Sequence, residues 1–123
     1  MAKERGIGAV SVIVFCMLML YSEMAHASTY VVGGRTGWTF NMTAWVKGTY
    51  KAGDKLLFYY NATQHNVVMV DEAGYNSCTA SKGSKTYQSG RDYIELAKGS
   101  TYFICTFPGH CQDHGMKVAA LAV

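Results

Sequence analysis

Four side chains with metal-binding chemistry stand out in this chain. A thiol, an imidazole and a thioether lie within one short C-terminal segment, as Cys105, His110 and Met116, and an isolated histidine, His65, stands well upstream. Soft sulfur favours Cu(I), while imidazole suits both oxidation states, and two histidines, a cysteine and a weak axial methionine are the ligands of blue copper sites. The four residues therefore predict one type 1 copper ion that carries single electrons by outer-sphere transfer.

The elements that position these donors are short segments rich in β-branched and aromatic residues, separated by glycine-bearing turns. They span residues 29–32, 55–60, 65–70, 92–96, 101–105 and 116–123. Such spacing predicts an all-β domain, in which two antiparallel sheets form a Greek-key β-sandwich. Residues 38–47 and 71–77 are expected to hold one or two short helices. On this fold one loop brings Cys105, His110 and Met116 to the same end, and His65 must come from a neighbouring strand.

The N-terminal segment has the features of a signal peptide. Lys3 and Arg5 precede an apolar stretch over residues 7–21, and Ala25-His26-Ala27 matches the small-x-small cleavage pattern. A membrane anchor is the competing interpretation, but the apolar stretch is short for a span of about 20 residues. We therefore expect residues 1–27 to be cleaved, leaving a single secreted domain over residues 28–123.

The cysteines that remain after cleavage are odd in number. Cys16 leaves with the leader, so Cys78, Cys105 and Cys111 enter an oxidising compartment in which thiols normally pair. A Cys105–Cys111 disulfide would leave Cys78 without a role. A Cys78–Cys111 disulfide instead leaves Cys105 free to bind metal, and it explains more of the sequence.

The chain carries a small net positive charge. Eleven Lys and Arg residues against eight Asp and Glu give a net charge of +3. These basic residues are scattered, whereas a nucleic-acid-binding protein concentrates them on one face. We therefore expect no nucleic-acid partner. Acidic cell-wall polymers or a negatively charged redox partner fit this charge better.

Several motifs resemble those of a known family. Ala52-Gly53-Asp54, His65-Asn66-Val67-Val68, Tyr75-Asn76-Ser77-Cys78 and Phe103-Ile104-Cys105-Thr106-Phe107-Pro108-Gly109-His110-Cys111 are similar to the phytocyanins, the plant blue copper proteins, and to their plantacyanin or basic blue protein subgroup. The resemblance covers residues 28–123. It implies a cupredoxin fold, one type 1 copper bound by His65, Cys105, His110 and Met116, a Cys78–Cys111 disulfide, and an extracellular location in the apoplast or cell wall.

The loop that carries the donors departs from the family pattern. The axial residue follows the loop histidine by five positions in the family, but here Gly115 stands there and Met116 follows it. We expect the extra residue to lie within 112–115, so that the loop bulges and still presents Met116. The alternative is that His114 takes the axial position, which would lower the reduction potential and weaken the blue colour.

Other residues are assigned supporting roles. Asn66 is expected to hydrogen-bond the Cys105 sulfur or to brace the loop beside it. Two sequons, at Asn41 and Asn61, fit glycosylation of a secreted chain. The core is expected to contain the aromatic residues Trp38, Trp45, Phe58, Tyr59 and Tyr93, with Met42 and Met69 as fillers.

These features favour an electron carrier, with Phe107 and Pro108 around His110 as an apolar docking patch for a transient redox partner. A non-catalytic extracellular matrix or signalling protein built on the same copper-binding fold is the alternative. An enzyme is not expected, because oxygen chemistry needs an open coordination position or further coppers, and the chain contains no hydrolase motif. The sequence ends at Val123 without a GPI signal, so we expect no membrane anchor, and we expect a monomer.

Overall fold

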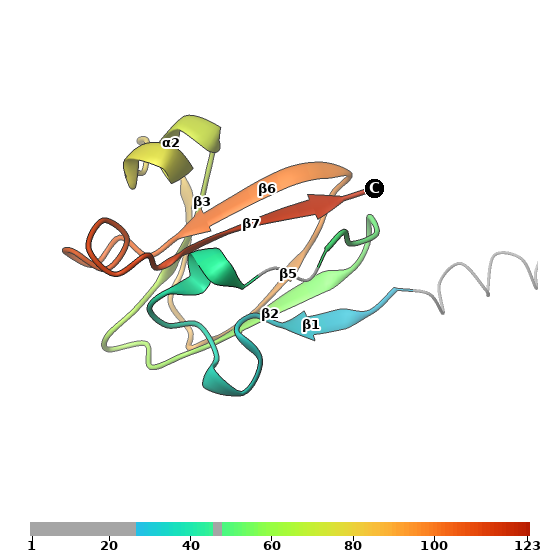
Figure 1. Cartoon of the computed structure of the whole chain (residues 1–123), viewed down its shortest axis with the longest axis horizontal. Coiled ribbons are helices and arrows are strands. Elements are labelled where there is room, and N and C mark those ends of the chain that lie inside the picture. The colour runs from blue at the N-terminus through green and yellow to red at the C-terminus, as the bar shows by residue number, and fades with distance from the viewer. Residues whose placement is uncertain (1–26, 46–47) are drawn as a thin grey trace, which may run out of the picture.

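The computed structural model describes residues 27–45 and 48–123, and the expected signal peptide lies outside them except for Ala27. Seven short strands and three short helices make up the described part (Figure 1). In chain order they are β1 (Thr29–Val31), η1 (Gly34–Thr36), η2 (Met42–Ala44), β2 (Lys55–Tyr59), β3 (Val67–Val70), α2 (Glu72–Ser77), β4 (Lys85–Tyr87), β5 (Arg91–Glu95), β6 (Gly99–Ile104) and β7 (Lys117–Ala122). None of these helices has the length and hydropathy needed to span a membrane.

The strands form two sheets, which confirms the predicted β-sandwich. One sheet has the order β1-β2-β5, and the other has the order β4-β3-β6-β7. All pairs are antiparallel except β1 and β2, which run parallel. The expectation of purely antiparallel sheets was therefore wrong at this edge. β1 and β2 run parallel because the long 32–54 connection brings the chain back to the end of the sheet at which β1 begins. A tight hairpin would instead make the two strands antiparallel.

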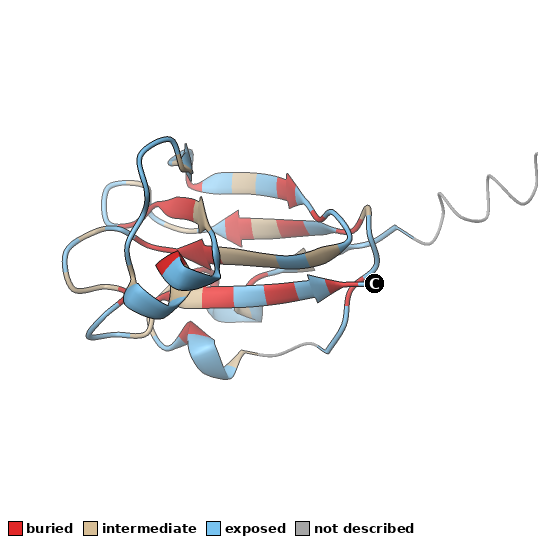
Figure 2. Ribbon diagram, turned by 90° about the horizontal axis from the view of Figure 1, so that it is seen from above, coloured by how far each residue is buried: buried red, intermediate tan, exposed pale blue. Residues whose placement is uncertain are grey.

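The core lies between the sheets and follows the period of two that strands impose on side chains. In β7 the buried residues Val118, Ala120 and Ala122 alternate with exposed ones, a pattern visible as red and blue stripes in Figure 2. Trp38 and Phe58 fill the centre, with their rings edge to face and 5.1 Å apart. These contacts hold the 32–54 connection against β2.

Two of the aromatic residues expected in the core lie on the surface instead. Tyr59 is 61% exposed and Tyr93 is 51% exposed. Each is next in sequence to a buried residue, Phe58 and Ile94 respectively, so the alternation of the strand directs it outward. Both therefore belong to the outer face of the three-stranded sheet.

A buried carboxylate ties the start of the domain to β2. Asp54 is 1% exposed, and its two oxygens accept the backbone N–H groups of Ser28 and Lys51, both at 2.9 Å. The Lys55 N–H in turn donates to the Ser28 carbonyl at 2.8 Å. This set of hydrogen bonds holds the segment before β1 in register with β2.

Candidate metal centre

The three strongest donors meet at one end of the sandwich. Cys105 directly follows β6, and His110 lies in the 105–116 loop that joins β6 to β7, drawn at the end remote from the C-terminus in Figure 1. His65 lies two residues before the neighbouring strand β3, which begins at Val67 rather than at residue 65 as expected. Because β3 and β6 are antiparallel partners, the start of one lies beside the end of the other.

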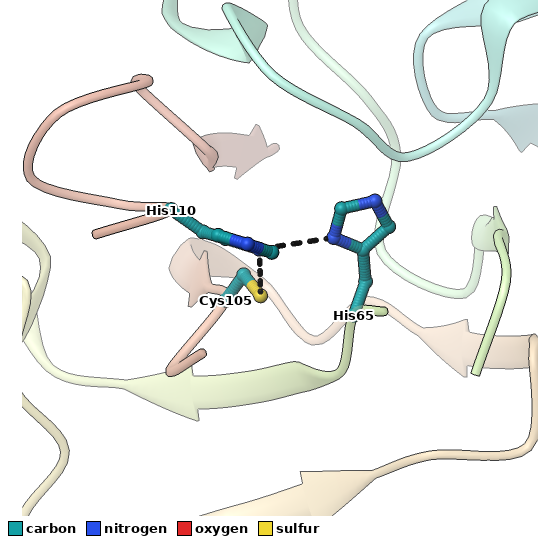
Figure 3. Close-up of side chains that lie close together, drawn as sticks. All are labelled: His65, Cys105 and His110. Atoms are coloured by element: carbon teal, nitrogen blue, oxygen red, sulfur yellow. Dashed lines mark hydrogen bonds between the residues drawn. The ribbon is translucent and has the colours of Figure 1, made fainter. Parts of the chain in front are cut away.

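The donor atoms of these residues converge on one point, as Figure 3 shows. The Nδ1 atoms of His65 and His110 are 3.1 Å apart, and the Cys105 Sγ is 3.5 Å from the His110 Nδ1. All three donor atoms lie within 4.8 Å of one another. Two ligands of one metal ion, with bonds of about 2.0–2.3 Å, lie about 3–4 Å apart at trigonal or tetrahedral angles. The spacing therefore fits ligands of a single ion.

The surroundings of the donors are largely apolar. Cys105 is 1% exposed and His65 is 8% exposed. Burial raises the pKa of the Cys105 thiol, and hydrogen bonds from the backbone of Asn66 and Phe107 oppose that rise. Burial, and then the neighbouring His110, lower the pKa of His65. His65 therefore presents a neutral ring to a cation, while the sulfur must lose its proton to become a ligand.

Asn66 connects the two strands that carry the donors. Its side-chain Nδ2 donates to the Thr106 hydroxyl at 2.8 Å, and its Oδ1 accepts the Thr106 backbone N–H at 2.9 Å. Of the two roles proposed for the Asn66 side chain, the structure shows the brace. The segment after His65 is thereby locked to the segment after Cys105.

Trp38 has a role at this site that the sequence did not indicate. Its indole Nε1–H donates to the Asn66 carbonyl at 2.9 Å, and its backbone N–H donates to the Tyr59 carbonyl, also at 2.9 Å. The ring is only 1% exposed. Trp38 thus fixes the His65–Asn66 segment from inside the core.

Comparison with known proteins identifies the family. Residues 38–116 match the model of the plastocyanin-like domain. The basic blue protein of Cucumis sativus is 56% identical over 97 residues, which are 78% of this chain and all of that protein. The solved structure of cucumber basic protein, a blue copper protein, superimposes with a TM-score of 0.75 at 56% identity, covering 77% of this chain and 99% of that one. Spinach plantacyanin does so with a TM-score of 0.66 at 50% identity, covering 71% and 94%.

The chain belongs to the plastocyanin-like family, as a phytocyanin of the plantacyanin subgroup. The fold and the subgroup predicted from the sequence are thereby confirmed. The arrangement of two imidazoles and a thiol agrees with a type 1 copper site, and one copper ion is the cofactor that this donor set accommodates.

The disulfide of this phytocyanin resolves the pairing of its cysteines. Cys78, which directly follows α2, is bonded to Cys111 with an S–S distance of 2.07 Å and Cα atoms 5.7 Å apart. Cys111 is buried with Val68 and Ile104 in a small second core. Among the described residues Cys105 is the free cysteine. The bridge therefore fastens the metal-site loop to α2.

The lengthened loop folds into a compact helical turn. The N–H of Asp113 donates to the Gly109 carbonyl at 2.9 Å, and the N–H of Gly115 donates to the Cys111 carbonyl at 3.1 Å. Gly115 has a φ of 60°, which only glycine adopts at little cost. The Met116 N–H then returns to the His110 carbonyl at 3.0 Å, and the Met116 side chain is fully buried in the core that contains Cys105.

His114, the alternative axial donor, lies apart from the three converging donors. It is exposed and stacks on Phe40, with ring centroids 4.4 Å apart at 23°. Phe40 packs edge to face on His110 at 4.9 Å and on His65 at 5.7 Å. Phe40 therefore shields both histidines, a role for which the sequence carried no signal.

Proposed function

We propose that this phytocyanin is a secreted electron carrier whose copper ion is bound by His65, Cys105, His110 and Met116. The observation that carries the proposal is the convergence of one sulfur and two nitrogen donors within 4.8 Å. Bound copper would supply the one-electron chemistry by alternating between Cu(I) and Cu(II). Met116 is assigned the axial position because its side chain is buried with Cys105, whereas His114 faces solvent.

The support around the donors favours electron transfer over catalysis. Asn66 and Thr106 lock the two donor-bearing segments, and the disulfide at Cys111 restrains the loop. Donors that are held in this way change little in position when the charge of the ion changes. With all four proposed ligands in place, no coordination position is left for a substrate, so we do not assign an enzymatic activity.

Electrons would enter and leave the site through His110, because this ligand is partly exposed. A shallow hollow of about 400 Å³ lies over it, lined by Phe40, Phe107 and both histidines, among others. Phe107 stacks on His110 with centroids 5.7 Å apart. This apolar surface suits brief contact with a redox partner of unknown identity.

The cellular setting belongs to the same proposal. We infer that residues 1–27 are removed as a signal peptide and that residues 28–123 form a monomeric domain in the apoplast or cell wall, without a nucleic-acid partner. Asn41 and Asn61 are both exposed, as glycosylation would require. The net charge of +3 favours contact with acidic cell-wall polymers.

A role as a matrix or signalling protein is the second candidate. The observation that favours it is the outer face of the β1-β2-β5 sheet, where the exposed Tyr59 and Tyr93 flank Arg91. Such a surface is suited to recognition and does not depend on the copper changing its oxidation state.

The experiment that tests the electron-carrier proposal is the optical and EPR spectrum of the purified protein with Cu(II). We expect an intense thiolate-to-copper band near roughly 600 nm, and its loss in Cys105→Ser. His65→Ala and His110→Ala should weaken copper binding or admit added imidazole. A blue band that survives Cys105→Ser would refute the assignment, and a blue protein without reversible voltammetry would favour the second candidate.

A further inference from the structure

A groove of about 690 Å³ runs along the surface beside the metal centre. It shares Thr39, Gln64 and His65 with the hollow over His110, so the two adjoin. From there the groove extends to the exposed end of the β2–β5 pair, where Tyr59 and Arg91 are partners in register. Electron transfer through His110 does not use this groove.

The charge in the groove is positive. Arg91 is the only Lys, Arg, Asp or Glu among the described residues that line it. The carboxylate of Asp92 belongs to the opposite face of β5 from Arg91, where its oxygens accept hydrogen bonds from the Tyr60 hydroxyl at 2.5 Å and the Ser89 hydroxyl at 2.6 Å. The Arg91 guanidinium is steadied by Tyr93, whose hydroxyl accepts from Nη2 at 3.2 Å. The groove is thus complementary to an anion.

Other side chains that line the groove are of types suited to binding a sugar. Tyr59 is 61% exposed and offers a flat ring. Thr39 and Gln64 add a hydroxyl and an amide, each able to donate and to accept hydrogen bonds. An aromatic face with neutral polar groups around it matches a pyranose ring, which has apolar C–H faces and a rim of hydroxyls. A single guanidinium beside it matches a carboxylate, which it can bind through two hydrogen bonds.

We propose that this groove binds a uronic-acid polysaccharide. A sugar ring lies on Tyr59, its carboxylate binds Arg91, and neighbouring hydroxyls bind Thr39 and Gln64. The inference rests on the extracellular location proposed above and is independent of electron transfer. A polymer seated here passes beside His65 and leaves the Phe107 side of His110 open to a redox partner, so the protein can be retained on a wall polymer while its metal centre stays accessible.

The test is a calorimetric or NMR titration of the copper-loaded domain with unesterified oligogalacturonate at low salt. Asn61 lines the groove, so the proposal requires the form of the protein in which Asn61 carries no glycan. The protein is therefore produced in the bacterial periplasm, where disulfides form and no N-glycan is added. We expect Arg91→Gln to weaken binding at least about tenfold, because a charge-assisted hydrogen bond is lost. Lys82→Gln, which removes an equal charge from an exposed turn outside the groove, should change binding less than about twofold.

Further variants separate sugar recognition from general attraction. Tyr59→Ala should weaken binding severalfold, whereas Tyr59→Phe, which keeps the ring, should bind like the unmodified protein. Fully methyl-esterified oligomer and polyglutamate should both bind weakly. Equal losses in Arg91→Gln and Lys82→Gln, or polyglutamate bound as tightly as oligogalacturonate, would overturn the proposal. The copper spectrum of each sample shows whether the metal centre is intact, so failure of the groove and failure of the electron-carrier proposal can be told apart.

Discussion

The brace formed by Asn66 makes a quantitative prediction about stability. Asn66→Ala removes both side-chain hydrogen bonds to Thr106, of 2.8 and 2.9 Å. Each is worth about 1 kcal/mol net. Because Asn66 is only 7% exposed, the truncation also leaves a small void, whereas the exposed Thr106 can regain partners from water. We expect a loss of about 2–3 kcal/mol in the free energy of unfolding.

The assay is guanidinium unfolding of the copper-free, disulfide-intact protein, followed by the tryptophan fluorescence of the buried Trp38 and the half-buried Trp45. Thr106→Val is the matched variant, since it removes the hydroxyl and retains the backbone N–H that Asn66 Oδ1 accepts. It should cost about 1 kcal/mol alone and close to nothing in the Asn66→Ala background. The resulting coupling energy isolates the bond between the two side chains.

Two results would refute this reasoning. An Asn66→Ala protein within about 0.5 kcal/mol of the unmodified one would mean that the brace contributes nothing to folding. Additive losses in the double variant would mean that Asn66 and Thr106 act separately. Neither result depends on copper, so the outcome concerns the scaffold alone.

The axial position, the disulfide and the thiol give three more predictions. Met116→Gln should lower the reduction potential measured by voltammetry, because an oxygen donor stabilises Cu(II). His114→Ala should leave the potential nearly unchanged. A large shift in His114→Ala with none in Met116→Gln would show that His114 is the axial ligand. Cys78→Ser should cost about 2–5 kcal/mol in urea unfolding yet keep the blue band, and a folded but colourless variant would contradict this. Since burial raises the pKa of Cys105, copper binding near neutral pH should release about one proton from the thiol and strengthen as pH rises. Calorimetry in buffers of different ionisation enthalpy measures that proton, and its absence would show that the thiol is already ionised.

The sequence was most informative where residue type alone restricts the chemistry. Cysteine, histidine and methionine in one segment leave few metals to choose from, and the odd number of cysteines favoured the disulfide that the structure contains between Cys78 and Cys111. The strands over residues 55–59 and 67–70 and the helix over residues 72–77 also lie where the local pattern placed them.

Contacts between distant parts of the chain were harder to predict from the sequence. The indole of Trp38 bonds a carbonyl 28 residues away, and nothing in the local pattern around Trp38 encodes that partner. A brace by Asn66 was expected because Asn66 stands beside a proposed ligand, but its partner Thr106, 40 residues away, was not predicted. The strand β4 was missed for a related reason, because residues 85–87 are mostly exposed and pair only at the edge of a sheet.

The buried Asp54 gives the predicted signal-peptide cleavage a physical consequence. In the uncut chain its oxygen accepts an ordinary amide N–H from Ser28 at 2.9 Å. Cleavage after Ala27 would turn that nitrogen into a positively charged amino terminus and convert the contact into an ion pair with a charge-assisted hydrogen bond. The precursor lacks this attraction, so the protease that releases the domain would also strengthen the contact between the segment before β1 and β2. The mature domain would then be more stable than the same domain in the precursor, because its amino terminus forms an ion pair with Asp54.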